Sequence, residues 1–216
     1  MSVSFLILCM EEPIAPVAIA HTRSRSVSAD PIAILIIQRG CSPHVFLEQD
    51  LIKPGAIESR QFQLKIAEEC LSESTLVVLP TGLGKTVIAL IVIAKTLGVK
   101  NGKVLFLAPT KPLVDQHASF LAENLTEGTI TTFTGEVKPE QREELWKESR
   151  IIVSTPQVIE NDLDAGRGSV TDFDLIVFDE AHRAVGDYAY VRIAAKYSLQ
   201  KAVSYTHLTL PTKRIV

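Results

Sequence analysis

The sequence predicts an α/β fold in which helices flank a mainly parallel sheet, and two observations support this prediction. Between about residues 76 and 179, short apolar segments alternate with longer segments of helical length. The short segments are apolar along their whole length, as strands buried on both faces are. Strands that alternate with helices pair in parallel through right-handed crossovers, so we expect one parallel sheet covered on both faces.

The expected elements follow one another along the chain. The first helix is expected over about residues 59–71, with Ser59 as its N-terminal cap. The first strand is expected at 76–79, and the run that starts at Lys85 is long enough for a second helix. Further strands are expected at 104–108, 129–133, 151–154 and 175–178, and further helices through 124, over 139–148 and after 156.

The chain turns sharply after the first strand, at Gly82 and Gly84. Neither residue carries a Cβ, so the backbone can expose its amide groups at the positive end of the next helix, where anions bind. Lys85 can reach the β- and γ-phosphate oxygens of a nucleotide, and the Thr86 hydroxyl can coordinate Mg²⁺. An ordinary glycine-bearing turn is the plainer alternative. The pattern predicts a P-loop that binds ATP and Mg²⁺ through Pro80, Thr81, Gly82, Leu83, Gly84, Lys85 and Thr86.

Two carboxylates, Asp179 and Glu180, follow the strand expected at 175–178. A carboxylate at the end of a buried strand can hold Mg²⁺ directly or through water, so Asp179 joins Thr86 as a predicted metal ligand. Glu180 can orient and deprotonate the water that attacks the γ-phosphorus. His182 is placed to form a hydrogen bond across the cleft to a second domain. We therefore predict a catalytic set of Lys85, Asp179, Glu180 and His182, against the alternative of a strand that ends in two solvated acids.

Gln63 is a candidate for base recognition. A Gln amide can exchange hydrogen bonds with the N6 and N7 edge of adenine. Its position shortly before the P-loop supports that role, although a solvated helix start is the more common reason for such a residue.

Composition limits the classes of function. The chain has 216 residues and a net charge of −3, so no global basic field indicates a nucleic-acid partner, and any such contact must be local. Its three cysteines are odd in number and widely spaced, which favours a reducing cytoplasm and no zinc site. The apolar run at 4–10 is too short for a membrane span and lacks a signal-peptide layout, so we expect no membrane partner.

Four motifs in order resemble a known family. PTGLGKT, APTKPLVDQH, STPQVIEND and DEAHRAVGDYAYV are similar to motifs I, Ia, Ic and II of superfamily 2 helicases. They resemble most closely the archaeal Hef helicase–nuclease and its eukaryotic Fanconi-anaemia-group-M relatives, over about residues 51–197. The resemblance implies a RecA-like P-loop NTPase domain at 51–203. It also implies the ATP-dependent motor of a DNA helicase or translocase that acts in DNA repair or replication-fork processing.

The resemblance also implies roles for individual residues. Arg60 and Gln63 correspond to the adenine-recognising Q-motif. Loops at the strand ends would contact single-stranded or branched DNA through its phosphates, without sequence recognition. The residues implied in this DNA track are Thr110, Lys111, Gly135, Thr155 and Pro156.

The chain departs from the family pattern beyond the DEAH motif. We find no Thr/Ser-Ala-Ser/Thr motif III, no second RecA-like domain and no nuclease domain, so we expect a sheet incomplete at the C-terminus and a chain that binds ATP without unwinding DNA. Residues 1–45 are expected to be an uncertain or disordered extension. Residues 204–216 resemble a translated sequencing adapter and are expected to be a non-native tail, with a genuine strand at 208–210 as the alternative. An RNA-directed DEAH-type helicase and a nucleotide-binding module without turnover are the alternative functions.

Overall fold

The computed structural model describes residues 3–10, 45–46, 50–99, 102–204 and 213–215. Its main feature is a seven-stranded sheet with the strand order β6-β7-β5-β8-β1-β4-β9. In that order, the strands are β6 (Ile130–Phe133), β7 (Ile151–Ser154), β5 (Val104–Leu107), β8 (Leu175–Asp179), β1 (Val3–Met10), β4 (Thr75–Pro80) and β9 (Lys213–Ile215). The separate strands β2 (Val45–Phe46) and β3 (Glu58–Ser59) pair with each other.

The predicted mainly parallel sheet is confirmed. β6, β7, β5 and β8 pair with one another in parallel, and so do β4 and β9. All five strands expected between residues 76 and 179 are present, and each end lies within one residue of the expected one.

The N-terminal strand β1 differs from the expectation for residues 1–45. Instead of belonging to a disordered extension, residues 3–10 form a strand between β4 and β8 and pair antiparallel with both. A strand in that position satisfies its backbone N–H and C=O groups on both sides, which gives an apolar extended segment a reason to order. The rest of the extension lies outside the described residues, apart from β2.

Part of the expected C-terminal tail also has a place in the sheet. Lys213–Ile215 forms β9, which pairs with the edge of β4 from Thr75 to Val77. The alternative strand at 208–210 lies outside the described residues. That residues 204–216 are a non-native tail stays a prediction.

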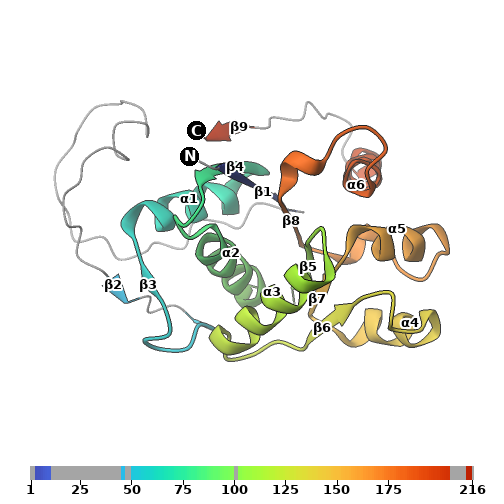
Figure 1. The fold of residues 1–216 in the computed structure, drawn as a ribbon, viewed down its shortest axis with the longest axis horizontal. Helices are drawn as coiled ribbons and strands as arrows, with labels where there is room; N and C mark the ends of the chain where they lie inside the picture. Colours follow the sequence, from blue (N-terminus) through green and yellow to red (C-terminus); the bar gives the residue numbers. More distant parts are fainter. Residues whose placement is uncertain (1–2, 11–44, 47–49, 100–101, 205–212, 216) are drawn as a thin grey trace.

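Within the described part of the chain, six α-helices cover the sheet in two layers (Figure 1). One face carries α1 (Gln61–Ser72), α2 (Lys85–Val99) and α3 (Lys111–Asn124), and the other carries α4 (Pro139–Glu148), α5 (Pro156–Asp164) and α6 (Ala189–Ser204). The first helix begins later than expected, because Arg60 and not Ser59 is its N-cap. Ser59 belongs to β3, and its pairing with Val45 holds it in extended backbone. None of the helices that the structure describes is long and apolar enough to span a bilayer.

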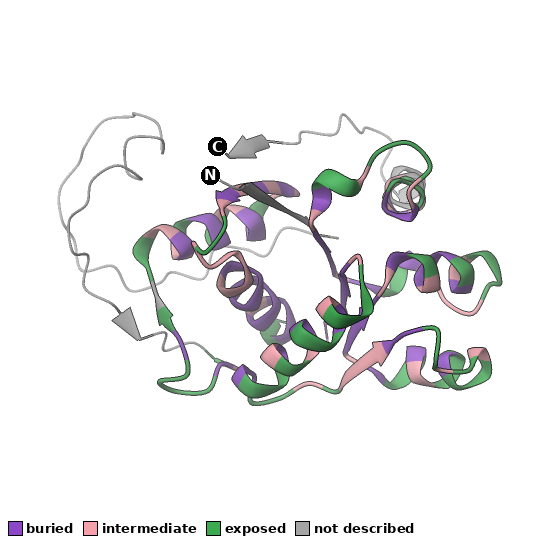
Figure 2. Ribbon diagram, viewed as in Figure 1, coloured by how far each residue is buried: buried purple, intermediate pink, exposed green. Residues whose placement is uncertain are grey.

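The core lies in two apolar clusters, one on each face of the sheet. Successive residues of β5 alternate between them: Val104 and Phe106 pack with the α1–α3 layer, and Leu105 and Leu107 with the opposite layer. This alternation is the two-residue period of a strand buried on both faces. The buried surfaces of both helical layers accordingly turn toward the sheet (Figure 2).

A buried charge cluster joins two helices of the second layer. Asp162 on α5 has no solvent exposure, and its carboxylate accepts two hydrogen bonds from Arg142 on α4, at 2.6 and 2.7 Å. Arg167, just after α5, donates a third at 2.8 Å. Asp162 is thus the shared counter-ion of both arginines, and its removal would leave the buried Arg142 guanidinium without one.

We expect Asp162→Ala to lower the free energy of unfolding by about 3–5 kcal/mol, because a buried arginine loses its counter-ion. Glu143→Ala is the control, since Glu143 is exposed and lies 4.0 Å from Lys147 in a surface pair. The control should cost less than about 1 kcal/mol. Urea denaturation of both variants measures the difference, and equal losses would contradict a stabilising role for the cluster.

Candidate active site

The predicted P-loop is a tight turn between β4 and α2. Gly82 and Gly84 have φ angles of +88° and +77°, in the region that favours glycine, and α2 begins at the next residue, Lys85. The Leu83 N–H donates to the Pro80 carbonyl at 3.3 Å and closes the turn. The backbone N–H groups at the start of α2 therefore point outward at the positive end of a helix, as an anion site requires.

Gln63, on α1, stabilises this turn through its side-chain amide. Its side-chain amide donates to the Leu83 carbonyl at 3.0 Å, and its oxygen accepts the Arg60 backbone N–H at 2.8 Å. The side chain is buried, and a Cβ added to Gly84 would collide with its amide nitrogen. Gln63 thus braces the P-loop. The predicted adenine contact of Gln63 and Arg60 stays a prediction.

The register of the sheet brings the P-loop and the acidic pair to the same edge. Leu6 of β1 pairs with Val77 of β4 on one side and with Asp179 of β8 on the other. Since neighbouring strands lie about 4.8 Å apart, Asp179 is level with Val77 at about 10 Å. β4 continues for three more residues, to Pro80, and then turns back as the P-loop.

The charges of the site lie close enough to affect one another. Burial lowers the pKa of the Lys85 ammonium below its usual range, and the carboxylates of Glu180 and Asp179 act in the opposite direction. The ammonium is therefore partly desolvated in the protein alone and faces negative charge. Phosphate oxygens would supply more negative charge there, so nucleotide binding should favour the protonated form.

Glu180 has a strained backbone. Its φ of 50° and ψ of 46° lie in the left-handed region, which costs a non-glycine residue about 1–3 kcal/mol. This conformation turns the chain between the end of β8 and the short 3₁₀ helix at Ala181–Arg183. The predicted interdomain residue His182 lies beside it, with Nδ1 at 3.2 Å from the Glu180 carboxylate. Its contact to a second domain stays a prediction.

Two residues to which the sequence patterns assigned no role contact Asp179. His117, on α3, places Nε2 at 2.8 Å from the Asp179 carboxylate. The Tyr190 hydroxyl, from α6, donates to the Asp179 backbone carbonyl at 2.8 Å and lies 3.1 Å from that of Leu107. Burial raises the pKa of Tyr190 above its usual range, so the hydroxyl stays a donor. Both residues belong to the helicase-like motifs, but only the fold brings them to Asp179.

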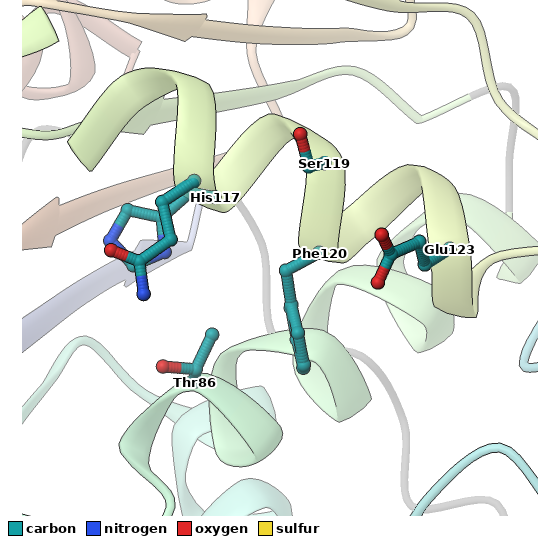
Figure 3. A pocket seen from close by; sticks show the side chains of 6 residues that line it. Thr86, His117, Ser119, Phe120 and Glu123 are labelled. Carbon is teal, nitrogen blue, oxygen red and sulfur yellow. The ribbon is translucent and has the colours of Figure 1, made fainter. Parts of the chain in front are cut away.

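A cavity of about 360 Å³ opens beside the P-loop, between α2 and α3. Thr86 and His117 face each other across it (Figure 3), and its other lining residues are Gln116, Ser119, Phe120 and Glu123. Thr86 and Asp179 would supply a hydroxyl and a carboxylate, the hard oxygen ligands that Mg²⁺ takes when nucleotide phosphates and water complete its shell. The residues present therefore fit a magnesium ion bound with a nucleotide.

The predicted DNA-contacting residues lie at the same edge of the sheet as Asp179. Thr110 and Lys111 follow β5, Gly135 follows β6, and Thr155 and Pro156 follow β7. Because these three strands are parallel, the loops after them share one edge. The Lys111 ammonium forms an ion pair with the Glu136 carboxylate, which joins the first two loops directly.

The comparisons with known proteins agree with this site. The sequence pattern of DEAD/DEAH box helicases matches residues 60–209. The chain is 50% identical over 155 residues to a putative ATP-dependent RNA helicase of Methanocaldococcus jannaschii, a match that covers 71% of this chain and 20% of the relative. It is 40% identical over 158 residues to the mouse Fanconi anemia group M protein homolog (72% and 8% covered). It is 44% identical over 137 residues to the ATP-dependent DNA helicase MPH1 of Pyricularia oryzae (62% and 12% covered).

A helicase domain of known structure is also similar to this chain. The Hef helicase domain of Pyrococcus furiosus is 46% identical, with a TM-score of 0.59, over 66% of this chain and 30% of that one. The resemblance to Hef and to Fanconi-anaemia-group-M proteins is therefore confirmed. The chain spans a fifth or less of the length of these curated relatives.

We expect Gln63→Ala to weaken the binding of Mg-ATP and Mg-GTP about tenfold each, because a half-buried Leu83 carbonyl loses its donor (about 1.4 kcal/mol). Titration with fluorescent analogues of both nucleotides measures the effect. Gln61→Ala, an exposed position on the same helix, should bind as the unchanged protein does. A loss confined to ATP would show that adenine recognition, and not support of the turn, is the main role of Gln63.

Proposed function

Because this chain belongs to the DEAD/DEAH box helicase family, we propose that it is the ATP-binding motor domain of an ATP-dependent DNA helicase or translocase. The observation that carries the proposal is that Lys85, which begins α2 after the P-loop, and Asp179 and Glu180, at the end of β8, lie at one edge of the sheet. A lysine at a P-loop and a carboxylate pair at the end of a nearby strand are the parts that phosphoryl transfer to water needs.

Each residue has a defined task in this proposal. The P-loop N–H groups and the Lys85 ammonium bind the β- and γ-phosphates, and Thr86 and Asp179 hold Mg²⁺. A bound Mg²⁺ would neutralise charge on the phosphate oxygens. Glu180 accepts the proton of the attacking water.

DNA is the proposed polymer. In support, MPH1 of Pyricularia oryzae, which is 44% identical over 137 residues, is named a DNA helicase. The loops after β5, β6 and β7 would contact phosphates of single-stranded or branched DNA. A second RecA-like domain and a cytoplasmic location of the whole protein are further parts of the proposal, carried over from the sequence.

RNA is the second candidate polymer, because the Methanocaldococcus jannaschii relative is named a putative RNA helicase. Competition between single-stranded DNA and RNA of the same sequence for binding to this chain separates the two candidates. Preferential binding of DNA supports the first, and preferential binding of RNA supports the second.

We expect Lys85→Ala to weaken Mg-ATP binding by at least tenfold, because the phosphates lose their facing ammonium. Glu180→Gln should leave binding within about twofold, because it keeps the side-chain shape, and should lower hydrolysis about 10²- to 10⁴-fold in a protein that carries both motor domains. Fluorescent-nucleotide titration and phosphate release measure the two effects.

Lys95 provides the control, since it lies on the same helix but away from its P-loop end, and Lys95→Ala should change neither quantity. Unchanged affinity in Lys85→Ala would count against the P-loop assignment. Unchanged hydrolysis in Glu180→Gln would exclude Glu180 as the base.

We expect Lys111→Ala to weaken single-stranded DNA binding about equally for all sequences and to lower the salt slope by about 0.7, the value for one phosphate contact. The matched control is Lys147→Ala, because Lys147 lies in the last turn of α4, near the opposite edge of the sheet. Filter binding at several salt concentrations measures both. A Lys111→Ala effect that depends on base sequence would contradict phosphate contact.

A further inference from the structure

His117 joins the two sides of the proposed magnesium site. From α3 its ring forms a hydrogen bond to the Asp179 side chain at the end of β8, and it lines the same cavity as Thr86 at the start of α2 (Figure 3). It thus lies beside both proposed ligands of the metal without being one of them. The magnesium ligands predicted from the sequence are Thr86 and Asp179 only.

The chemistry of the pair fixes the direction of the hydrogen bond. An ionised carboxylate only accepts, so His117 Nε2 must carry the proton and donate to Asp179 Oδ2 at 2.8 Å. The ring itself is held: His117 is 7% exposed and packs on Phe106 with ring centroids 4.5 Å apart. A donor that cannot move fixes the rotation of the carboxylate that it contacts.

The backbone of Asp179 is held as well, by the Tyr190 hydroxyl on its carbonyl oxygen. With both the backbone and Oδ2 fixed, Oδ1 has one remaining orientation. Without the His117 donor, the carboxylate could rotate toward the nearby Lys85 ammonium, whose charge it already influences. Carboxylates that bind metals depend in this way on hydrogen bonds from residues behind them.

We propose that His117 is a positioning residue that orients the Asp179 carboxylate toward the cation of a bound Mg-nucleotide. This inference rests on the proposed function, since it requires that the chain bind Mg-ATP. It adds a residue from α3, an element otherwise assigned to DNA contact, to the support of the metal site.

The test compares two substitutions of equal polarity. In His117→Gln the amide nitrogen can occupy the place of imidazole Nε2 and keep the donor to Asp179. In His117→Asn the shorter side chain puts its amide nitrogen at the place of Nδ1, which does not contact Asp179. Both lose the ring packing on Phe106, so any general loss of stability is shared, and thermal melting without nucleotide checks that the two are alike.

The measurement is the affinity for a fluorescent ATP analogue in EDTA and across a Mg²⁺ titration. In EDTA we expect the unchanged protein, His117→Gln and His117→Asn to bind the analogue with equal affinity, through the P-loop. The Mg²⁺ concentration at half-maximal tightening should rise about 10-fold or more in His117→Asn and stay within about threefold in His117→Gln. In an Asp179→Asn background, His117→Asn should have no further effect.

The outcomes separate the inference from the proposed function. If the unchanged protein shows no Mg²⁺-dependent nucleotide binding, the proposed function fails and the role of His117 fails with it. If that protein binds but His117→Asn keeps its Mg²⁺ midpoint, or His117→Gln shifts as far as His117→Asn, the inference alone is overturned. The inference is also overturned if His117→Asn shifts the Mg²⁺ midpoint equally in the unchanged protein and in the Asp179→Asn background.

Discussion

The parallel pairing of β5, β6, β7 and β8 is the constraint on which the rest of the structure depends. Parallel strands end at one edge, so loops far apart in the chain meet there, and crossover helices must return along both faces. Those helices pack their apolar faces against the apolar faces of the strands. The same pairing aligns the loops that follow each strand. Burial of the core and alignment of these loops are therefore consequences of one pattern of hydrogen bonds, and β1 links the P-loop strand β4 to it.

The residues expected to act on nucleotide are held in place by hydrogen bonds from residues of other elements. Gln63 supports the P-loop, His117 the Asp179 side chain and Tyr190 the Asp179 backbone. Such support allows one unfavourable backbone conformation, that of Glu180, to persist at the site. The three supporting residues come from α1, α3 and α6, so both helical layers contribute to the geometry of one edge.

β1 shows how backbone pairing can order a segment that contains no sequence motif. Its residues are apolar but lie far from any motif, and their place in the sheet comes from backbone groups offered by β4 and β8 together. It is antiparallel to both of these neighbours, whereas β5 to β8 pair only in parallel among themselves. The strand thus completes the central part of the sheet and keeps β4 and β8 two strand spacings apart.

The sequence by itself determined the α/β class, the P-loop and the DEAH acids, because glycines at a strand–helix turn and carboxylates at a strand end are local patterns with local causes. It also located the strands between residues 76 and 179, because continuous apolar runs of that length, bounded by turns, are typical of strands buried on both faces. These features depend on residues that are close together in the chain.

Only the tertiary structure decided the place of β1, the bracing role of Gln63 and the contacts of His117 and Tyr190 with Asp179. The hydrogen bonds join residues that are 11 apart in the chain for Tyr190 with Asp179, 20 for Gln63 with Leu83 and 62 for His117 with Asp179. The pairing of β1 depends in the same way on two strands far along the chain. Strand order brings such groups together, and no local pattern specifies which of them will meet.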